Sequence, residues 1–329
     1  MSKQSLVRWV VLSCALFVIA GCTKDAAPDT AADAKAADPV VVLDAGQEPK
    51  LLLRYRISEG TTTTSTATFR VATLATSEDA EVLTVLPGLR LDIVSGPAAV
   101  TENGVRFNVD IVNSEALVPK GFDEALAADL QAGAAILDDV GAWVEIDDRG
   151  LLVAGEFNEV AKRADIPTRL IRMIVNTRST VTRVVLPAEP VGIGARWETK
   201  REIEIYGFKV TQVDTYQLVD QAGDELMLNL TAQQTALPQK VEFPEEGIEI
   251  EVTSMTAKAT GQIILNLDAL ESDASANGTS VDKIVVKTVS GTENIEVDEV
   301  FDIQIANTTN LMPNRRLETG KKRKRRSGR

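Results

Sequence analysis

The chain has 329 residues, of which 44% are hydrophobic, 4% aromatic and 25% charged, and its formal net charge is −13. This composition is that of an acidic globular protein, because 12 prolines and 21 glycines are too few for a fibrous or wholly disordered chain. The sequence contains no histidine. That absence excludes histidine-dependent catalytic triads, histidine-ligated zinc or iron, and imidazole acid–base catalysis.

Residues 1–21 have the pattern of an export signal. Lys3 and Arg8 place positive charge ahead of an apolar run from Trp9 to Ala20, which ends at small residues before Cys22. As a helix, this run of about 12 residues would rise only about 18 Å, too short for a hydrocarbon core of about 30 Å. We therefore expect a cleaved signal peptide rather than a stable membrane span.

The residues Ile19-Ala20-Gly21-Cys22 resemble the lipobox of bacterial lipoproteins, in which small residues precede an obligatory cysteine. The resemblance implies cleavage between Gly21 and Cys22, attachment of diacylglycerol to the Cys22 sulfur, and acylation of the new amino terminus. An ordinary secretory signal with a chance cysteine is the alternative. Because Cys14 leaves with the signal, Cys22 would be the only cysteine of the mature chain, and no internal disulfide could form.

The segment that follows the signal is expected to connect a lipid anchor to a folded body. Each buried methylene of an acyl chain contributes about 0.8 kcal/mol, so two or three chains hold a protein almost permanently. Thr23, rather than Asp, follows Cys22, and by resemblance to enterobacterial sorting this favours the outer membrane. Residues 22–48 are rich in Ala, Asp, Pro and Thr and predict a disordered tether. Pro28 and Pro39 oppose the alternative of a helical stalk.

From Leu51 onward, apolar and polar residues alternate with a period of two, which predicts strands. The predicted strands are Leu51–Ile57, Thr66–Leu74, Val105–Ile111, Trp143–Ile146, Trp197–Ile205, Lys209–Val219, Glu225–Leu230, Ile248–Val252, Gly261–Leu267, Lys283–Val289 and Val300–Ile305. Turn-forming residues between apolar runs predict hairpin loops at Glu102–Gly104, Asp147–Gly150, Gln221–Asp224 and Ala276–Gly278. Together these patterns predict an antiparallel meander.

Two stretches have the spacing of amphipathic helices. Phe122–Leu137 places Leu126, Leu130 and Leu137 on one face. In Asp165–Arg178, the apolar side carries Leu170, Ile171, Met173 and Ile174, and the other side Arg169, Arg172 and Asn176. We expect the second helix to pack in the core; a helix lying on a membrane surface is the alternative.

The expected fold is mainly β (α+β), with two lobes of curved antiparallel sheet and one or two packed amphipathic helices. The proline-containing segment Leu186–Pro190 is a predicted connector between a lobe over residues 49–186 and a second lobe over residues 187–310. Residues 311–329 are expected to form a basic disordered tail. Residues 103–111 faintly resemble residues 222–230 in register, and a duplication of the lobes is left open because such matches are common among hairpins.

The segment from Leu186 to Trp197, followed by Tyr216-Gln217-Leu218, resembles a recurrent signature of uncharacterised bacterial lipoproteins. The resemblance covers residues 140 to 270, approximately. That family has no activity that can be carried over to this chain. The resemblance therefore supports a β-rich exported protein and assigns no catalytic residue.

Two motifs suggest cofactor or metal sites and fail on their spacing. Gly192-Ile193-Gly194 lacks a third glycine where Trp197 stands, and a strand follows it rather than precedes it, so it is not a dinucleotide loop. Asp273–Gly278 opens like a calcium loop, but Ile284 occupies the twelfth position, so a solvated turn is expected. We expect no cofactor and no bound metal.

Clusters of carboxylates keep a hydrolase open as the alternative function, since glycoside hydrolysis needs only two suitably spaced acids. The candidates are Glu145, Asp147 and Asp148 in one group, and Glu242, Glu245, Glu246, Glu249 and Glu251 in another. Glu249 and Glu251 alternate with isoleucines as a solvent-facing side of a strand would. No residue is assigned as catalytic.

The carboxyl-terminal tail carries seven positive charges in nine residues, namely Lys321, Lys322, Arg323, Lys324, Arg325, Arg326 and Arg329. Of 35 basic residues in all, two lie in the signal and seven in this tail, so 26 remain against 48 acidic residues. The tail is either a solvated disordered segment or an electrostatic contact with anionic lipid or glycolipid. No nucleic-acid partner is expected.

These patterns predict a lipid-anchored protein of the cell envelope, held at the outer membrane and facing the periplasm or the exterior. The expected function is a non-enzymatic binding or scaffolding module, with an apolar or lipid ligand, since helices over a curved sheet can leave an apolar groove. The alternative is a carboxylate-dependent envelope hydrolase, similar to glycosidases. An apolar cavity would favour the first function, and two convergent acids within a cleft the second.

Overall fold

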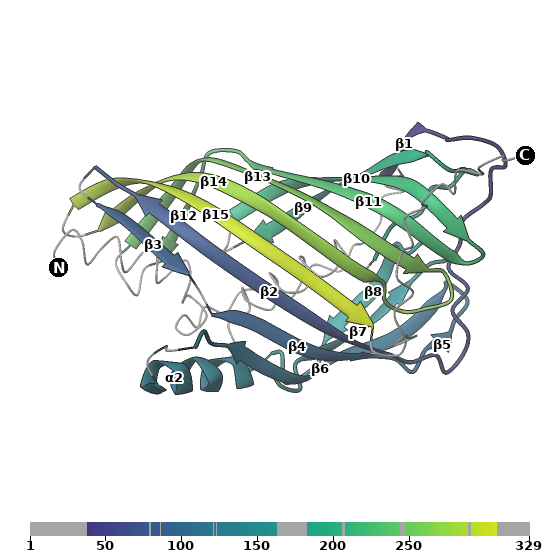
Figure 1. The fold of residues 1–329 in the computed structure, drawn as a ribbon, viewed down its shortest axis with the longest axis horizontal. Coiled ribbons are helices and arrows are strands. Elements are labelled where there is room, and N and C mark those ends of the chain that lie inside the picture. Colours follow the sequence, from purple (N-terminus) through teal and green to yellow (C-terminus); the bar gives the residue numbers. More distant parts are fainter. Residues whose placement is uncertain are drawn as a thin grey trace, which may run out of the picture.

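A computed structural model describes residues 38–78, 80–85, 87–120, 122, 124–162, 183–205, 208–243, 248–288 and 291–307. Within these ranges, fifteen strands form one open sheet in which every pairing is antiparallel (Figure 1). The strands are β1 (Val40–Asp44), β2 (Thr63–Thr76), β3 (Glu81–Val85), β4 (Gly88–Ser95), β5 (Ala99–Val100), β6 (Val105–Leu117), β7 (Gly141–Ile146), β8 (Leu152–Phe157), β9 (Arg196–Ile205), β10 (Phe208–Ala222), β11 (Glu225–Ala236), β12 (Gln239–Phe243), β13 (Ile248–Asn266), β14 (Asp273–Thr288) and β15 (Gly291–Asn307).

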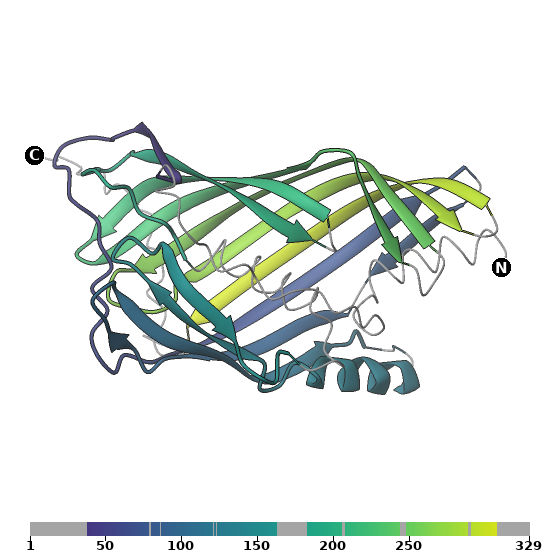
Figure 2. The ribbon, with the colours of Figure 1, turned by 180° about the vertical axis from the view of Figure 1, so that it is seen from behind.

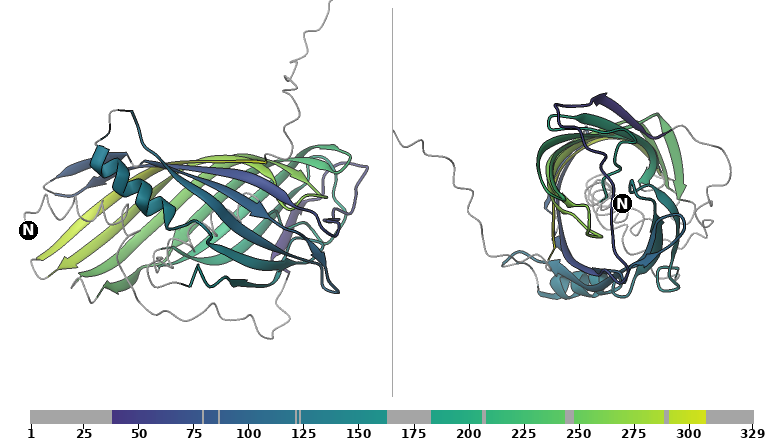
Figure 3. Two further views of the ribbon diagram at one scale, coloured as in Figure 1. Left: turned by 90° about the horizontal axis from the view of Figure 1, so that it is seen from below. Right: turned by 90° about the vertical axis from the view of Figure 1, so that its right-hand side faces the viewer.

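The mainly β fold class is confirmed. The strand order is β1-β9-β10-β11-β13-β14-β15-β2-β4-β6-β7-β8, with β12, β3 and β5 paired beside β13, β2 and β6. Strands of the predicted first lobe are neighbours, as are β9 to β15 of the predicted second lobe, and the two sets meet where β15 pairs with β2. Both predicted lobes therefore contribute to a single sheet, which curls through most of a full turn (Figure 3).

The concave face of the sheet carries two apolar clusters. The larger one lies at one end and contains Trp197, Tyr216, Leu228, Ile263 and Phe107. The smaller one lies towards the other end and contains Ala75, Ile250, Val286 and Ile295 among others. In each strand, period-2 alternation sends one set of side chains into these clusters and the other set to the convex face.

The helix predicted over Phe122–Leu137 is confirmed as α2 (Glu124–Ala135), the one α-helix of the described residues. It lies beside β6 at the edge of the sheet (Figures 1 and 2). The Ser114 hydroxyl donates to the Ala134 carbonyl at 2.6 Å, and Leu137 after the helix is buried in the larger cluster. The second predicted helix, Asp165–Arg178, lies outside the described residues.

The tether prediction is wrong for residues 40–44, which form β1 and pair with β9. Val40 and Val42 pack against the larger apolar cluster. Compositional bias towards Ala, Asp and Pro ends near residue 39, and the four apolar residues Val40 to Leu43 are enough to add an edge strand to a sheet. The rest of the predicted tether up to residue 37 lies outside the described part of the chain.

The predicted hairpin at Ala276–Gly278 and the solvated turn at Asp273–Gly278 are wrong, because these residues belong to the long strand β14. Ala274 and Ala276 are buried against the larger cluster. A side chain at Gly278 would overlap the Lys258 carbonyl oxygen and the Phe301 ring. The glycine therefore serves close packing within the sheet instead of a turn. The predicted loops Glu102–Gly104 and Asp147–Gly150 do lie between strands. Of the predicted loop Gln221–Asp224, Gly223 and Asp224 lie between β10 and β11, whereas Gln221 and Ala222 end β10.

The predicted strand Leu51–Ile57 is also wrong in type. Apart from a single bridge between Leu51 and Val191, these residues are extended without pairing in the sheet. Buried and more exposed residues nevertheless alternate in this segment, because Leu53, Tyr55 and Ile57 are buried in the larger cluster. An extended chain that crosses the end of a sheet buries alternate residues just as a strand does.

Candidate functional site

Residues 51–58, which we call the end link, cross one end of the curled sheet between β1 and β2 (Figure 2). Their backbone groups bond to turns rather than to a neighbouring strand. Tyr55 donates its N–H to the Asp148 carbonyl at 2.7 Å, and Arg56 donates to the Leu267 carbonyl at 2.8 Å. The Tyr55 hydroxyl donates to the Val184 carbonyl at 2.9 Å. The end link thereby ties the β7–β8 turn to the β13–β14 turn.

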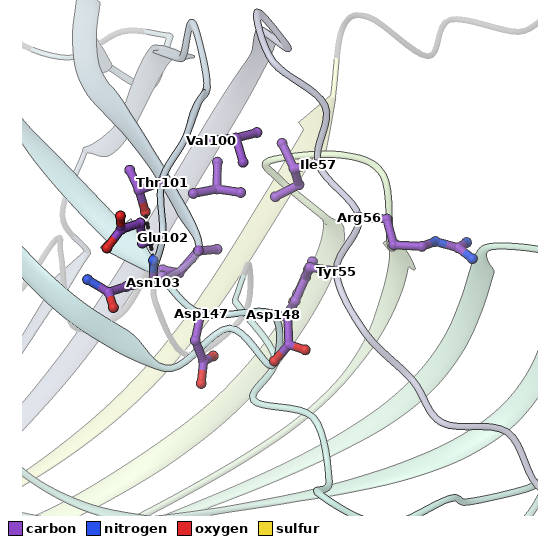
Figure 4. Close-up of a pocket in the computed structure, with 12 residues that line it drawn as sticks. Tyr55, Arg56, Ile57, Val100, Thr101, Glu102, Asn103, Asp147 and Asp148 are labelled. Carbon is purple, nitrogen blue, oxygen red and sulfur yellow. Dashed lines mark hydrogen bonds between the residues drawn. The ribbon is translucent and has the colours of Figure 1, made fainter.

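A pocket of about 400 Å³ lies between the end link, the β5–β6 turn and the β7–β8 turn (Figure 4). We call it the end pocket. It is lined by Tyr55, Arg56, Ile57, Val100, Thr101, Glu102, Asn103, Gly104, Val105, Ile146, Asp147 and Asp148. Its walls combine aliphatic side chains from three chain segments with three carboxylates from the two turns. Such a lining suits a ligand with an apolar part and a cationic or hydrogen-bond-donating part.

Two glycines allow the turns to approach so closely. Gly104 has a φ of 149°, and a side chain there would overlap the Ile146 carbonyl oxygen. Gly150 has a φ of 85°, and its Cβ would lie 2.7 Å from Cε2 of Tyr55. Both positions therefore require glycine, for backbone conformation and for space. The sequence marked these residues as turns but not as walls of a pocket.

The three carboxylates of the end pocket differ in how they are held. Asp147 accepts hydrogen bonds from the backbone N–H groups of Arg149 and Leu151, at 2.9 and 2.8 Å, and so shapes its own turn. Asp148 forms an ion pair with Arg54 at 3.3 Å. Glu102 is exposed, and the described residues offer it no hydrogen bond or ion pair. Glu102 is therefore the carboxylate most available to a ligand.

The structure does not bring Glu145 together with Asp147 and Asp148 as a catalytic group. Arg106 donates to Glu145 at 2.6 Å through Nη2 and at 3.2 Å through Nε, and Thr101 donates at 2.7 Å. These bonds, those from Arg106 first, hold the pKa of Glu145 below its usual range. Glu145 therefore positions the Thr101 turn beside the end pocket and does not line it.

The second group of candidate acids lies on the convex face. Glu249 and Glu251 pair with Lys240 and Lys287, at N–O distances from 2.7 to 3.6 Å. The hydrogen bond from Lys287 is the main cause that lowers the pKa of Glu249. Glu242 lies directly opposite Glu249 in the β12–β13 ladder, whereas Glu245 and Glu246 lie outside the described residues. This cluster is a cross-strand ionic network on a solvent-facing side.

A row of residues that are polar except for Ala257, which sequence reasoning missed, crosses the concave face between the two apolar clusters. Neighbours in this row are directly opposite each other in the strand register. From β2 to β9 the row is Thr73, Glu299, Ser280, Ala257, Gln234, Gln212 and Arg201. We call it the polar row. Because its members come from seven strands, only the register of the whole sheet reveals it.

On the β9–β11 side of the polar row, two hydrogen-bonded glutamine side chains connect to an ion pair. Gln234 donates to Gln212 at 2.9 Å, and Gln212 donates to Asp214 at 2.7 Å. Asp214 also lies 3.2 Å from a guanidinium nitrogen of Arg201. Burial raises the pKa of Asp214 despite this cation.

At the other side of the polar row, two acids lie on neighbouring strands. Glu299 accepts hydrogen bonds from Ser280 at 3.3 Å and from Thr73 at 3.5 Å, and burial raises its pKa. Asp282 lies diagonally across from it, and Oδ1 of Asp282 has no hydrogen-bond partner in the described part of the chain. Burial, with smaller contributions from Glu299 and Asp298, raises the pKa of Asp282 to about 7.

Several sequence-predicted features lie elsewhere. Gly21, Cys22 and the basic residues Lys321, Lys322, Arg323, Lys324, Arg325 and Arg326 are outside the described residues. Gly192-Ile193-Gly194 forms a tight turn before β9, and a side chain at Gly192 would overlap the Gln47 carbonyl oxygen. Across the described ranges, no helix has the length and apolar character of a membrane span. The same ranges hold no group of three or more acidic or cysteine residues arranged around a metal.

Comparisons with known proteins add one family match. A model described as a "Family of unknown function (DUF6263)" matches residues 178–269, which include all of β9, β10, β11, β12 and β13. The expectation that this part of the chain resembles a family without a known activity is thereby confirmed. Of the curated proteins compared, none matches.

Among solved structures, OpdL of Pseudomonas aeruginosa has 8% identity and a TM-score of 0.22, over 75% of this chain and 99% of OpdL. OpdQ of the same organism has 8% identity and a TM-score of 0.23, over 75% of this chain and 99% of OpdQ. A loop-deletion mutant of OmpT, an outer membrane protein of Vibrio cholerae, has 7% identity and a TM-score of 0.20, over 74% and 99%. These likenesses carry no argument about this chain. Residues 178–269 are similar to a family of unknown function.

Proposed function

We propose that the protein is a lipid-anchored, non-enzymatic binding module of the cell envelope and that the end pocket holds its ligand. The ligand class is an apolar or lipid-like molecule that carries a cationic or hydrogen-bond-donating group. The single observation behind this proposal is the end pocket itself, in which Ile57, Val100 and Val105 stand beside the exposed carboxylate of Glu102.

The position of the end pocket relative to the proposed anchor supports this function. Asp38, the first described residue, accepts hydrogen bonds from the Arg149 guanidinium at 2.7 and 2.9 Å. These bonds hold the pKa of Asp38 below its usual range. Because Arg149 belongs to the same turn as Asp147 and Asp148, the chain that leads back to Cys22 leaves the body beside the end pocket. A ligand drawn from the membrane would therefore reach the pocket over a short distance.

A hydrolase is the second candidate, and Asp282 with Glu299 is the observation that favours it. The two acids lie on neighbouring strands, and burial raises the pKa of each, as a general acid requires. However, Thr73 and Ser280 hold Glu299, and neither acid lines the end pocket. In the end pocket, Asp147 shapes its own turn, Asp148 is ion-paired and Glu102 is exposed. This arrangement agrees better with a binding module than with a hydrolase.

We further propose that the basic tail residues 321–326 make a second, salt-sensitive contact with anionic lipid or glycolipid. Each basic residue near an anionic surface contributes about 1 kcal/mol at low ionic strength. This contact would add to the lipid anchor at the outer membrane, where the body faces the periplasm or the exterior.

The ligand proposal predicts that Glu102→Gln weakens binding of a long-chain amine, such as dodecylamine, by about threefold to fivefold. The substitution removes one carboxylate from an exposed ion pair, which is worth up to about 1 kcal/mol. Binding is measured by titration calorimetry on the purified full-length protein. Glu225→Gln, at the first residue of β11 and outside the end pocket, is the matched control and should bind as the parent does. Equal affinity of the parent and Glu102→Gln for the amine would contradict the role given to Glu102.

The anchor proposal predicts that the protein incorporates labelled palmitate and that Cys22→Ser incorporates none. Only a thiol accepts diacylglycerol at this position, so the serine variant should also keep its signal peptide. Intact-mass spectrometry of both proteins provides the readout, with Cys14→Ser as the control because that residue leaves with the signal. A parent protein without acyl mass would overturn the anchor while leaving the amine-binding experiment interpretable.

A further inference from the structure

Aliphatic side chains are exposed together at the end of the sheet that the end link crosses. The group, which we call the aliphatic end, consists of Val41 and Leu43 in β1, Leu51 and Leu52 in the end link, Ile193 in the turn before β9, and Val219 in β10. Their exposed fractions run from 39% to 59%. Their alternate neighbours, such as Val42 and Leu53, pack in the larger apolar cluster. The exposed set is therefore separate from the set that stabilises the core.

Backbone hydrogen bonds bring these six residues to one end of the molecule. Gln47 donates to the Ile193 carbonyl at 2.9 Å, and Leu51 and Val191 exchange bonds at 2.9 and 3.0 Å. Gly194 donates to the Leu218 carbonyl at 2.8 Å, which places the Ile193 turn beside Val219. Figure 1 shows β1 and the end link, in purple, at the same end of the sheet as the β10–β11 turn. Single exposed aliphatic residues need no explanation, but a gathered group indicates an interaction surface.

Within the described part of the chain, basic residues are not in excess around the aliphatic end. Asp38 pairs with Arg149, Lys50 lies 3.9 Å from Glu48, and Arg54 pairs with Asp148. The exposed acids Asp44 and Asp220 stand next to Leu43 and Val219 in the sequence. A surface built for an anionic membrane would carry an excess of basic residues. Paired charges around aliphatic residues fit a neutral, zwitterionic phospholipid surface instead.

The first described residue lies near the same surface. Asp38 stands two residues before β1, and Cys22 stands 16 residues before Asp38 in the sequence. A segment of this length spans at most about 55 Å when extended, and about 22 Å on average when flexible. An anchor at Cys22 would therefore hold the aliphatic end close to the bilayer, at a high effective concentration.

We propose that the aliphatic end contacts the membrane directly and inserts its side chains into the interface of a zwitterionic phospholipid bilayer. The high effective concentration rests on the anchor proposed above, whereas the affinity of the surface for lipid does not. The contact orients the body so that the end pocket, which shares residues 55–57 of the end link, lies near the lipid surface. A tethered protein without this contact would tumble freely at the end of its linker.

The proximity of the aliphatic end to the bilayer is tested on full-length protein reconstituted into phosphatidylcholine vesicles. An environment-sensitive dye is attached at Leu52→Cys. The control is the same dye at Leu237→Cys, which replaces the most exposed aliphatic residue of the β11–β12 turn, 82% exposed. We expect emission at position 52 to rise severalfold and to be quenched by nitroxide-labelled lipid, and position 237 to show neither effect. Equal quenching at both positions, or quenching at neither in protein whose acyl mass is verified, would overturn the contact.

Affinity is tested without an acyl anchor or a signal peptide, in the mature chain that begins at Thr23, by flotation with the same vesicles. Adding Leu51→Asn and Leu52→Asn should lower the partition coefficient roughly tenfold, because two half-exposed leucines lose most of their transfer free energy. The matched control is Leu83→Asn with Val85→Asn, two exposed aliphatic residues of β3. The tenfold loss should persist at high salt, since the basic tail is unchanged in every variant.

The two proposals fail in different ways. If the parent carries no acyl mass but the leucine pair still lowers partitioning tenfold, the anchor is wrong and the contact stands. If acyl mass is present and the leucine pair changes partitioning no more than the β3 pair does, the anchor stands and the contact is wrong. Partitioning that disappears at high salt would likewise assign vesicle binding to the tail and overturn the contact.

Discussion

Replacing Asp282 by asparagine is expected to stabilise the protein at pH 8 by about 2–4 kcal/mol and to have little effect at pH 4. Burial raises the pKa of Asp282 from 3.8 to about 7, with Glu299 and Asp298 contributing repulsion. A shift of this size corresponds to at most about 4 kcal/mol of differential interaction, and partial exposure reduces it. The cost arises because Oδ1 has no hydrogen-bond partner in the described residues.

The direction of this pH dependence follows from the difference in proton binding between the folded and the unfolded state. In the unfolded chain Asp282 loses its proton near pH 3.8, whereas in the folded protein it keeps the proton until about pH 7. The folded state therefore binds more protons between these values, and stability falls as the pH rises through about 7. Burial of Glu299 and Asp214 raises their pKa values too, and adds to the same slope. Asparagine at position 282 cannot ionise, so the contribution of Asp282 to the slope of stability against pH disappears in the variant.

The measurement is urea denaturation of parent and variant at half-unit steps from pH 4 to pH 8.5. Asp302→Asn is the matched control, because Asp302 lies on the neighbouring strand β15 and pairs with Arg70 on the convex face at 3.4 Å. The control should keep the slope of the parent. A parent whose stability is constant across this range, or an Asp282→Asn variant that is less stable at pH 8, would contradict the account.

Regular strands that bury one face in the core could be predicted from the sequence. In residues 105–111 of β6 and in β11, the alternation of apolar and polar residues largely follows the alternation of buried and exposed residues in the structure. The turn Asp147–Gly150 was predictable for a local reason, since an aspartate that accepts its own backbone N–H groups and a glycine with positive φ suffice to form it.

Errors arose where one local pattern fits two structures. Leu53, Tyr55 and Ile57 alternate as a strand would, yet their backbone groups bond to distant turns, and only the folded sheet provides those partners. Gly278 follows Asn277 as in a hairpin loop, but it is required by the Lys258 backbone and the Phe301 ring of neighbouring strands. Local preference was overridden in both cases by contacts between residues far apart in the sequence.

The end pocket and the polar row were beyond sequence reasoning for the same reason. The end pocket joins Ile57, Val100 and Ile146, whose proximity depends on the end link crossing the sheet. Arg201 and Glu299 are nearly one hundred positions apart and share a row through four intervening strands. Positions in the sequence show which of these residues are neighbours in space only after the strand order and register are known.

The largest loss of stability is expected for Trp197→Ala, at roughly 3–5 kcal/mol. The Trp197 side chain is fully buried, its ring stacks on Tyr216 with centroids 5.8 Å apart, and Nε1 donates to the Val185 carbonyl at 3.0 Å. Alanine would leave a large cavity and a buried carbonyl without its donor. Trp197→Phe keeps an aromatic ring and loses the hydrogen bond, so a smaller loss of about 1–2 kcal/mol is expected. Urea denaturation followed by circular dichroism measures both variants.

Trp143→Ala is the matched control, because the Trp143 ring is only partly buried and its main described partner is the Arg106 guanidinium, 4.6 Å from the ring centroid. Loss of this contact should cost about 1 kcal/mol or less. Since Trp197 lies opposite Val42 in the ladder that joins β1 to β9, its removal should also loosen β1, which leads to the proposed anchor. Faster hydrogen exchange in residues 40–44 of Trp197→Phe than in the parent would show this coupling. Similar losses of stability for the two alanine variants would contradict the central place given to Trp197.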